Sequence, residues 1–201
     1  LKLNNSILQL DLSNNKISDI GITSLSKNIL TKNPILSLSL SENNIKCEGI
    51  SSISEFLKAN NTITELHLGR NPINDKGINY LCQGLIVNNS LQTLLLDRIH
   101  ITEEGVSQLA DVLKANTNIT KLALNENGLT DISIKYLANA LRINIGLIEI
   151  ELGWNKITDV GVEYLISSLC TNRILSVIGL GYNKIGDYGA NLIHEILKSN
   201  D

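Results

Sequence analysis

The feature that most constrains the fold is a 28-residue repeat that runs through this chain of 201 residues without an insertion. Every copy carries the spacing L-x-x-L-x-L-x-x-N-x-I or a close variant of it. Its asparagine recurs at Asn15, Asn43, Asn71, Asn127, Asn155 and Asn183. Ile99 takes the asparagine position in the remaining copy, and Ser133 takes a position that is glycine in the others. The spacing predicts one domain over 1–201 with seven stacked repeats, at 6–33, 34–61, 62–89, 90–117, 118–145, 146–173 and 174–201.

Each copy predicts one strand and one helix. Apolar and polar residues alternate around Leu10 and Leu12, which is the period of a half-buried strand. Apolar residues at helical spacing follow an aspartate that suits a helix start, at Asp19, Asp75, Asp131, Asp159 and Asp187. One strand and one helix cannot bury their apolar faces alone, so the copies must stack. Because strands pack about 4.8 Å apart and helices about 8–10 Å apart, the stack must bend. We expect an α/β right-handed solenoid, a horseshoe arc with a parallel sheet on its concave face and helices on its convex face.

The asparagines of the repeat are expected to be structural. They stand where the chain leaves the strand, and an amide side chain can bond to backbone groups of its own turn and of adjacent copies. Stacking would align them in a buried polar ladder of Asn15, Asn43, Asn71, Asn127, Asn155 and Asn183. Asparagine elsewhere in the chain is abundant, and we expect no special role for it.

The segment 152–165, LGWNKITDVGVEYL, is echoed by 12–25 and 180–192. In these motifs the copies resemble the ribonuclease-inhibitor-like class of leucine-rich repeats over essentially the whole chain. Arrays of that class mostly bind proteins through the concave face, and members include Ran GTPase-activating protein, NOD-like receptor arrays and effectors of intracellular bacteria. The resemblance implies a protein–protein interaction scaffold. It also allows the array to be the recognition part of a larger receptor or of a secreted bacterial effector. The chain lacks the alternating repeat types and tryptophan content of ribonuclease inhibitor, which argues against ribonuclease as the partner.

Composition and charge limit the classes of partner and ligand that the chain is expected to bind. The net charge is −3 and no block of lysine or arginine occurs, which argues against nucleic acid and against an anionic membrane. Cys47, Cys82 and Cys170 show neither disulfide nor zinc spacing, and they favour a cytoplasmic location, or the host cytosol for a bacterial effector. His100 and His194 lack metal-ligand spacing, and no phosphate-binding loop occurs. We expect a protein partner, no metal and no cofactor.

Both ends cut through the repeat. The opening 1–7 matches 57–63, which is the end of one repeat helix and the start of the next strand, and the chain stops in the same phase. We therefore expect a fragment of a longer array. Its end surfaces, near Ile7 and near Ile193, Ile196 and Leu197, would be apolar and would favour self-association.

Outward strand positions form columns along the predicted concave face. The column at the strand exit is Asn14, Glu42, Arg70, Arg98, Glu126, Trp154 and Tyr182. Tryptophan, tyrosine and arginine are enriched in binding hot spots. The alternative for the two arginines is a solvated ion-pair ladder with the neighbouring glutamates. We predict that the partner contacts Trp154, Tyr182, Arg70, Arg98, Glu126, Glu149, Glu151 and His67.

Catalysis finds little support in the sequence. Glu149 and Glu151 share one strand face and could mimic an acid–base pair, but no activated partner accompanies them. His67 has Glu65 beside it and no serine or cysteine nucleophile opposite. We expect no catalytic residue and no enzyme activity. The alternative is a GTPase-activating array of the Ran GTPase-activating type, for which no motif identifies the residues.

Overall fold

The computed structural model describes residues 6–28 and 34–199, in which seven strands alternate with seven helices. The strands are β1 (Gln9–Asp11), β2 (Ser37–Ser39), β3 (Glu65–His67), β4 (Thr93–Leu95), β5 (Lys121–Ala123), β6 (Glu149–Glu151) and β7 (Val177–Gly179). The helices are α1 (Asp19–Asn28), α2 (Cys47–Ala59), α3 (Asn74–Leu85), α4 (Glu103–Ala115), α5 (Asp131–Leu141), α6 (Asp159–Leu169) and α7 (Asp187–Ser199). Among these described helices, none is both long and apolar enough to cross a membrane.

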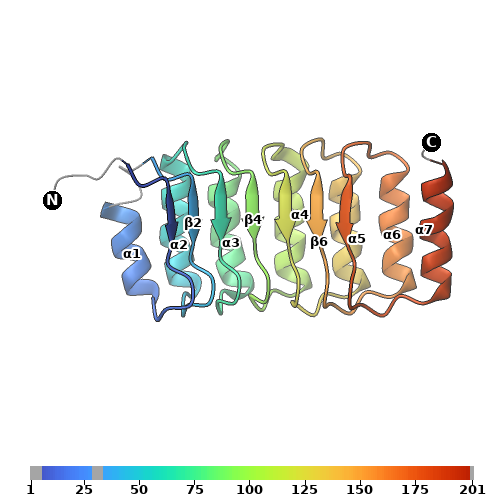
Figure 1. Cartoon of the computed structure of the whole chain (residues 1–201), viewed down its shortest axis with the longest axis horizontal. Helices are drawn as coiled ribbons and strands as arrows, with labels where there is room; N and C mark the ends of the chain where they lie inside the picture. Colours follow the sequence, from blue (N-terminus) through green and yellow to red (C-terminus); the bar gives the residue numbers. More distant parts are fainter. Residues whose placement is uncertain (1–5, 29–33, 200–201) are drawn as a thin grey trace.

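The strands form one parallel sheet in chain order, and each residue pairs with the residue 28 positions later, as Leu10 does with Leu38. The helices form a second layer on one face of that sheet (Figure 1). The row of helices extends beyond the row of strands at both ends, so the array bends with its strands on the inner side. The predicted α/β solenoid is confirmed.

Aliphatic side chains fill the space between the two layers. The central strand residues Leu38, Leu66, Leu94, Leu122 and Ile150 are each at most 1% exposed. The equivalent residue of β7, Ile178, is only partly buried, because no described repeat follows it. Leu10 of β1 is likewise only partly buried, so the core is continuous through the middle copies and open at the first and the last.

The asparagines of the repeat tie each turn to the one before it. Asn71 donates from Nδ2 to the carbonyl oxygens of Leu68 (3.0 Å) and, in the preceding copy, Leu40 (2.9 Å). Its Oδ1 accepts from the N–H of Ile45 at 3.0 Å. The same bonds to a preceding copy recur at Asn43, Asn155 and Asn183. Asn127 donates to the Leu96 carbonyl in the same way, but its Oδ1 accepts from the N–H of Ile99, which lies 28 rather than 26 residues earlier.

Burial of this ladder is uneven. Asn71 and Asn155 are buried, at 1% and 7% exposed, whereas Asn43, Asn127 and Asn183 are half-buried. Asn15 is exposed and bonds to the carbonyl oxygens of its own turn, Leu12 and Ser13. The expectation of a buried residue is wrong for Asn15, because no earlier copy within the described residues covers it.

A second asparagine ladder runs along the opposite edge of the array, where each helix ends. Asn88 donates from Nδ2 to the carbonyl oxygens of Leu57 and Asn60, both at 2.9 Å, and its Oδ1 accepts from the N–H of Leu91 at 2.9 Å. The buried members are Asn60, Asn88, Asn116, Asn144 and Asn172. The expectation that asparagine outside the strand exit has no special role is therefore wrong, and the signal that reveals this ladder is its own 28-residue spacing.

Four helices begin at a predicted aspartate, and Asp75 is the second residue of α3. Such a carboxylate caps the helix of the following copy. Oδ1 of Asp75 accepts from the N–H groups of Thr102 (2.8 Å) and Gly105 (3.2 Å). This contact explains the glycine of the repeat, because a Cβ at the equivalent Gly161 would lie 2.6 Å from Oδ1 of Asp131. Each repeat is thus joined to the next at the sheet exit, at the helix start and at the helix end.

Candidate protein-interaction surface

The strand-exit column consists of Asn14, Glu42, Arg70, Arg98, Glu126, Trp154 and Tyr182, and all seven have a left-handed backbone with φ between 50° and 58°. This conformation costs a non-glycine residue about 1–2 kcal/mol. It is supported by bonds to the next copy, since the N–H of Arg70 donates to the Asp97 carbonyl (2.7 Å) and that of Trp154 to the Gly181 carbonyl (2.8 Å). Because all copies share it, the conformation belongs to the turn. Its effect is to line up seven side chains along one rim of the concave face.

Trp154 and Tyr182 form an exposed aromatic pair in that column. Their ring centroids lie 3.7 Å apart with an interplanar angle of 10°, so the rings are stacked. The side chains nevertheless remain exposed, at 56% for Trp154 and 71% for Tyr182. Gly153 and Gly181 precede them and place no side chain beside the rings. The pair is a stacked aromatic surface that faces solvent.

The two arginines of the column are joined to its glutamates. Arg70 lies 3.5 Å from Glu42 and 3.4 Å from Glu126, and Arg98 lies 3.6 Å from Glu126. These pairs are partly exposed, and such pairs contribute about 0–1 kcal/mol each. The geometry is that of the solvated ladder, and the positive charge of both arginines is largely balanced within the column.

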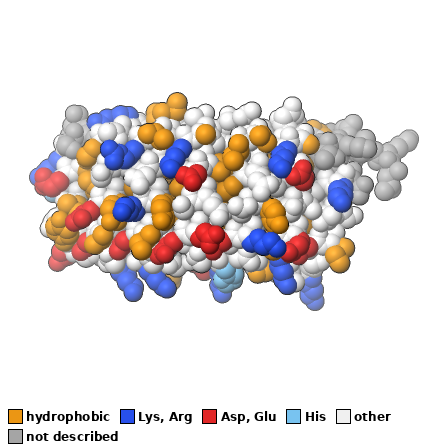
Figure 2. Space-filling model, turned by 180° about the vertical axis from the view of Figure 1, so that it is seen from behind, with side chains coloured by type: hydrophobic (Ala, Val, Ile, Leu, Met, Phe, Trp, Pro, Cys, Tyr) orange, Lys and Arg blue, Asp and Glu red, His pale blue; other side chains and the backbone are white. Residues whose placement is uncertain are grey.

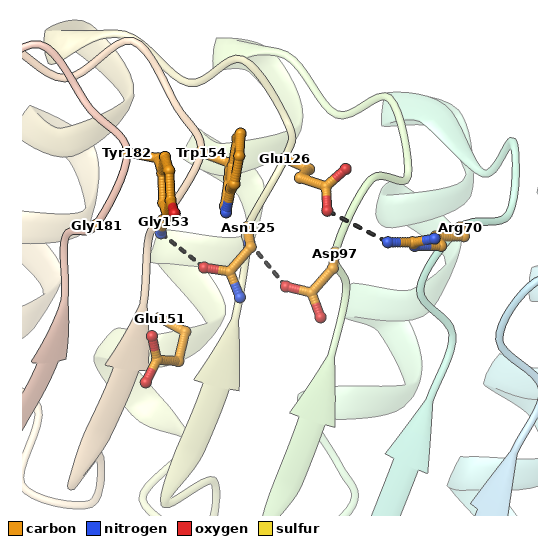
Figure 3. Close-up of a pocket in the computed structure, with 9 residues that line it drawn as sticks. All are labelled: Arg70, Asp97, Asn125, Glu126, Glu151, Gly153, Trp154, Gly181 and Tyr182. Carbon is orange, nitrogen blue, oxygen red and sulfur yellow. Dashed lines mark hydrogen bonds and ion pairs between the residues drawn. The ribbon is translucent and has the colours of Figure 1, made fainter.

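A cavity of about 450 Å³ opens between the aromatic pair and Arg70 (Figure 3). Two short hydrogen bonds between adjacent copies hold the residues at the base, or floor, of the cavity. The Asp97 carboxylate accepts from the N–H of Asn125 at 2.8 Å, and the Asn125 side-chain oxygen accepts from the N–H of Gly153 at 2.6 Å. Three consecutive copies therefore hold the floor in place. The lining residues are Arg70, Asp97, Asn125, Glu126, Glu151, Gly153, Trp154, Gly181 and Tyr182.

The predicted contact residues fall into two groups. The cavity brings together Trp154, Tyr182, Arg70, Glu126 and Glu151. It does not include the other three, which are Arg98, Glu149 and His67.

These three residues lie in other surroundings. Glu149 lies 2.6 Å from Lys121, and the hydrogen bond between them raises the pKa of the lysine. His67 lies 3.9 Å from Glu65 on its own strand. Arg98 lines a separate hollow of about 350 Å³ that also contains His100.

Two residues of the cavity floor, Asp97 and Asn125, were absent from the predicted contacts. The signal for them is their place one residue before the strand-exit column in their copies. The five other copies all carry serine or glycine at this position, so the larger polar side chains of these two stand out.

The helix face offers a different surface. Ile132, Val160 and Tyr188 occupy the same position near the start of α5, α6 and α7, and all three are exposed. Figure 2 shows hydrophobic side chains on this face interspersed with acidic and basic ones. On the helices themselves, the ammonium group of Lys135 in α5 lies 5.7 Å from the ring centre of Tyr164 in α6. These apolar residues lack the stacked geometry of the concave pair.

A family model described as "Leucine Rich repeat" matches residues 3–26, 31–54, 59–82, 115–138 and 146–165. The chain belongs to the leucine-rich repeat family. Among solved structures it is similar to leiomodin-1 actin-binding site 2, with 28% identity, a TM-score of 0.56, and coverage of 59% of this chain and 70% of that one. It is also similar to the tropomodulin C-terminal domain of Caenorhabditis elegans, with 14% identity, a TM-score of 0.61, and coverage of 75% and 92%. The second similarity shows the fold alone. No curated protein matches the chain in sequence.

Proposed function

We propose that this leucine-rich repeat array is a scaffold that binds a protein partner through its concave face, with Trp154 and Tyr182 at the centre of the contact. The supporting observation is the stacked and exposed geometry of this pair. Buried aromatic anchors supply much of the energy of protein interfaces, and a surface that is already ordered pays less entropy on binding.

Binding is better supported than catalysis. Glu149 is engaged by Lys121 at 2.6 Å, so it is not an unpaired partner for acid–base chemistry with Glu151. The three free thiols, Cys47, Cys82 and Cys170, favour a reducing compartment, and we propose a cytoplasmic location, or the host cytosol for a bacterial effector. A role as the recognition part of a larger receptor or effector is compatible with this surface.

Affinity capture from a lysate tests the proposal. Trp154→Ala should weaken a captured partner by about 2 kcal/mol or more, which is about thirtyfold. Asn14→Ala is the matched control, because Asn14 has the same position and the same left-handed backbone in the first copy. A folded Trp154→Ala protein that captures its partner as well as the control does would refute the contact.

Actin is the first defined partner to test, because the leiomodin-1 structure of 28% identity is described as an actin-binding site. Co-sedimentation with filaments and binding to monomers are the assays. The alternative of a GTPase-activating role of the Ran type is tested by GTP hydrolysis with a panel of small GTPases. Stimulated hydrolysis there would replace the scaffold proposal.

A further inference from the structure

We propose that the cavity beside the aromatic pair receives an arginine side chain, so that the array recognises a basic segment of its protein partner. This inference rests on the proposed function and adds the chemistry of the partner to it. It is carried by three features of the cavity, namely its aromatic wall, its excess of carboxylates and the balanced charge of its own arginine.

The aromatic wall suits a planar cation. Tyr182 covers one face of the Trp154 ring at 3.7 Å, and Figure 3 shows Glu126 on the opposite side of that ring. The second face of Trp154 is therefore directed toward the cavity, and the side chain is 56% exposed. A guanidinium group stacks on tryptophan through its plane and is attracted by the ring.

The charges around this wall leave negative charge for a ligand. Three carboxylates and one arginine line the cavity. Arg70 is shared between Glu42 and Glu126, so its charge is already balanced within the column. In the described part of the chain, neither Asp97 nor Glu151 lies within 4.0 Å of a basic group. Both interact electrostatically with Lys121, but its ammonium group is bonded to Glu149 at 2.6 Å.

Both of these carboxylates have an oxygen that can accept a hydrogen bond from a ligand. One oxygen of Asp97 is used by the N–H of Asn125, which leaves the other available. The carboxylate of Glu151 lies over Gly179, in space that any side chain at 179 would occupy. Arginine presents five donors in one plane, whereas lysine presents a compact and strongly hydrated charge. An arginine can therefore stack on Trp154 and bond to a carboxylate at the same time.

The only tryptophan of the chain is in this site, so its fluorescence reports directly on occupancy. The probes are four end-capped pentapeptides with glycine at every position except the third, which is arginine, citrulline, lysine or glutamate. We expect saturable quenching by the arginine peptide at the lowest concentration and an affinity that falls as salt is added. Citrulline keeps the planar shape without the charge and should bind at least about tenfold more weakly, since a charged hydrogen bond contributes about 1.5–3 kcal/mol.

Glu151→Gln should weaken the arginine peptide about fivefold, as expected for a partly exposed ion pair. Asp11→Asn is its matched control, because Asp11 takes the same strand position in the first copy, far from the cavity. An arginine peptide that fails to quench, a citrulline peptide of equal affinity, preferential binding of the glutamate peptide, or a Glu151→Gln protein that behaves like the control would each overturn the inference. If Trp154→Ala abolishes capture of a partner that Glu151→Gln still binds fully, the proposed function stands and the arginine inference falls.

Discussion

Replacing Asn155 with isoleucine tests how much the turn ladder contributes to stability. The chain already contains isoleucine at the equivalent Ile99, so a reading of the repeat alone would predict tolerance. The structure predicts the opposite. The Asn155 amide donates to the carbonyl oxygens of Leu124, Leu152 and Gly153, and its Oδ1 accepts from the N–H groups of Asn127 (3.1 Å) and Leu129 (3.0 Å).

The cost follows from those contacts. Two backbone donors near a buried side chain lose their acceptor, at about 1–3 kcal/mol each. Burial of the larger aliphatic side chain offsets about 1.5 kcal/mol or more of this loss. We expect Asn155→Ile to lower the free energy of unfolding by about 2–3 kcal/mol.

Ile99 is tolerated because the preceding turn is built differently. By register, the N–H of Ile73 would bond to an asparagine at 99, but it donates to the carbonyl of Asn71 at 2.8 Å. Asn74 adopts a left-handed φ of 58°, and its N–H donates to the Ile99 carbonyl at 2.9 Å. In the copy that precedes Asn155, Thr130 takes the position that Asn74 has in its own copy. The backbone of Thr130 is extended, so this turn lacks the arrangement seen at Asn74.

Urea denaturation followed by circular dichroism measures the difference. Asn15→Ile is the control, because Asn15 is exposed and bonds to its own turn, and it should cost under about 1 kcal/mol. Equal losses in the two variants would refute the view that bonds between copies carry the stability of the ladder.

Three further outcomes are expected. Burial raises the pKa of Cys82 to about 12. A thiol reagent at neutral pH should therefore modify the exposed Cys170 quickly and Cys82 only on unfolding, as measured by mass spectrometry. Rapid modification of Cys82 in the folded protein would contradict its burial. A glycine-to-alanine change is normally neutral or stabilising within a helix. Gly161→Ala should instead destabilise the folded protein by about 1–3 kcal/mol, because the new Cβ would meet the side chain of Asp131. Thermal unfolding measures the effect, and a raised Tm would contradict it. The exposed apolar residues at the two ends of the array, Leu8 and Leu197 among them, should drive self-association in light scattering, and a strictly monomeric protein at high concentration would contradict that expectation.

The architecture could be predicted because its cause is local and repeated. Apolar spacing within one copy determines which face of the strand and helix is buried, and the same spacing seven times determines the stack. The connections between copies were harder to predict. The carboxylate of Asp75 acts 27 and 30 residues away, at Thr102 and Gly105, where a sequence reading places it on its own helix. Ser133 fits the same rule, because the preceding copy has Glu103 where five other copies have aspartate, and that carboxylate bonds to Thr130. Cys47 takes this position in the remaining copy.

The candidate site was predictable in part. Trp154 and Tyr182 could be placed on the concave rim from their register, because side-chain direction along a strand follows a period of two. Their stacking depends on side-chain torsions, and the cavity floor depends on Asp97 and Asn125 reaching across neighbouring strands. Those distances come from the separation of parallel strands and from the left-handed turn, neither of which a single copy reveals.

The stretch 97–133 should be the weakest part of the array. It contains Ile99, which breaks the turn ladder, and two of the four buried side-chain atoms that lack a hydrogen-bond partner among the described residues, Oε1 of Gln108 and Oγ of Ser133. The other two, Oγ of Ser26 and of Ser54, lie in separate copies, neither of which has a break in the turn ladder. An unsatisfied buried polar atom costs about 1–3 kcal/mol. The stability of a solenoid is a sum of repeat and interface contributions, so this local deficit should lower the free energy of local opening here before the flanking repeats unfold.

Native-state hydrogen exchange mapped by repeat measures that opening. We expect the amides of α4 and β5 to exchange faster than those of the copies that contain Asn43 and Asn155. Ser133→Gly is the informative variant, because it removes the orphan hydroxyl, restores the glycine of the other copies and should slow exchange in this stretch alone. The rebuilt turn at Asn71 opposes the deficit by giving the N–H of Ile73 a partner. If the amides of 97–133 are protected as well as those around Asn43 and Asn155, that compensation is complete and the predicted weak point does not exist.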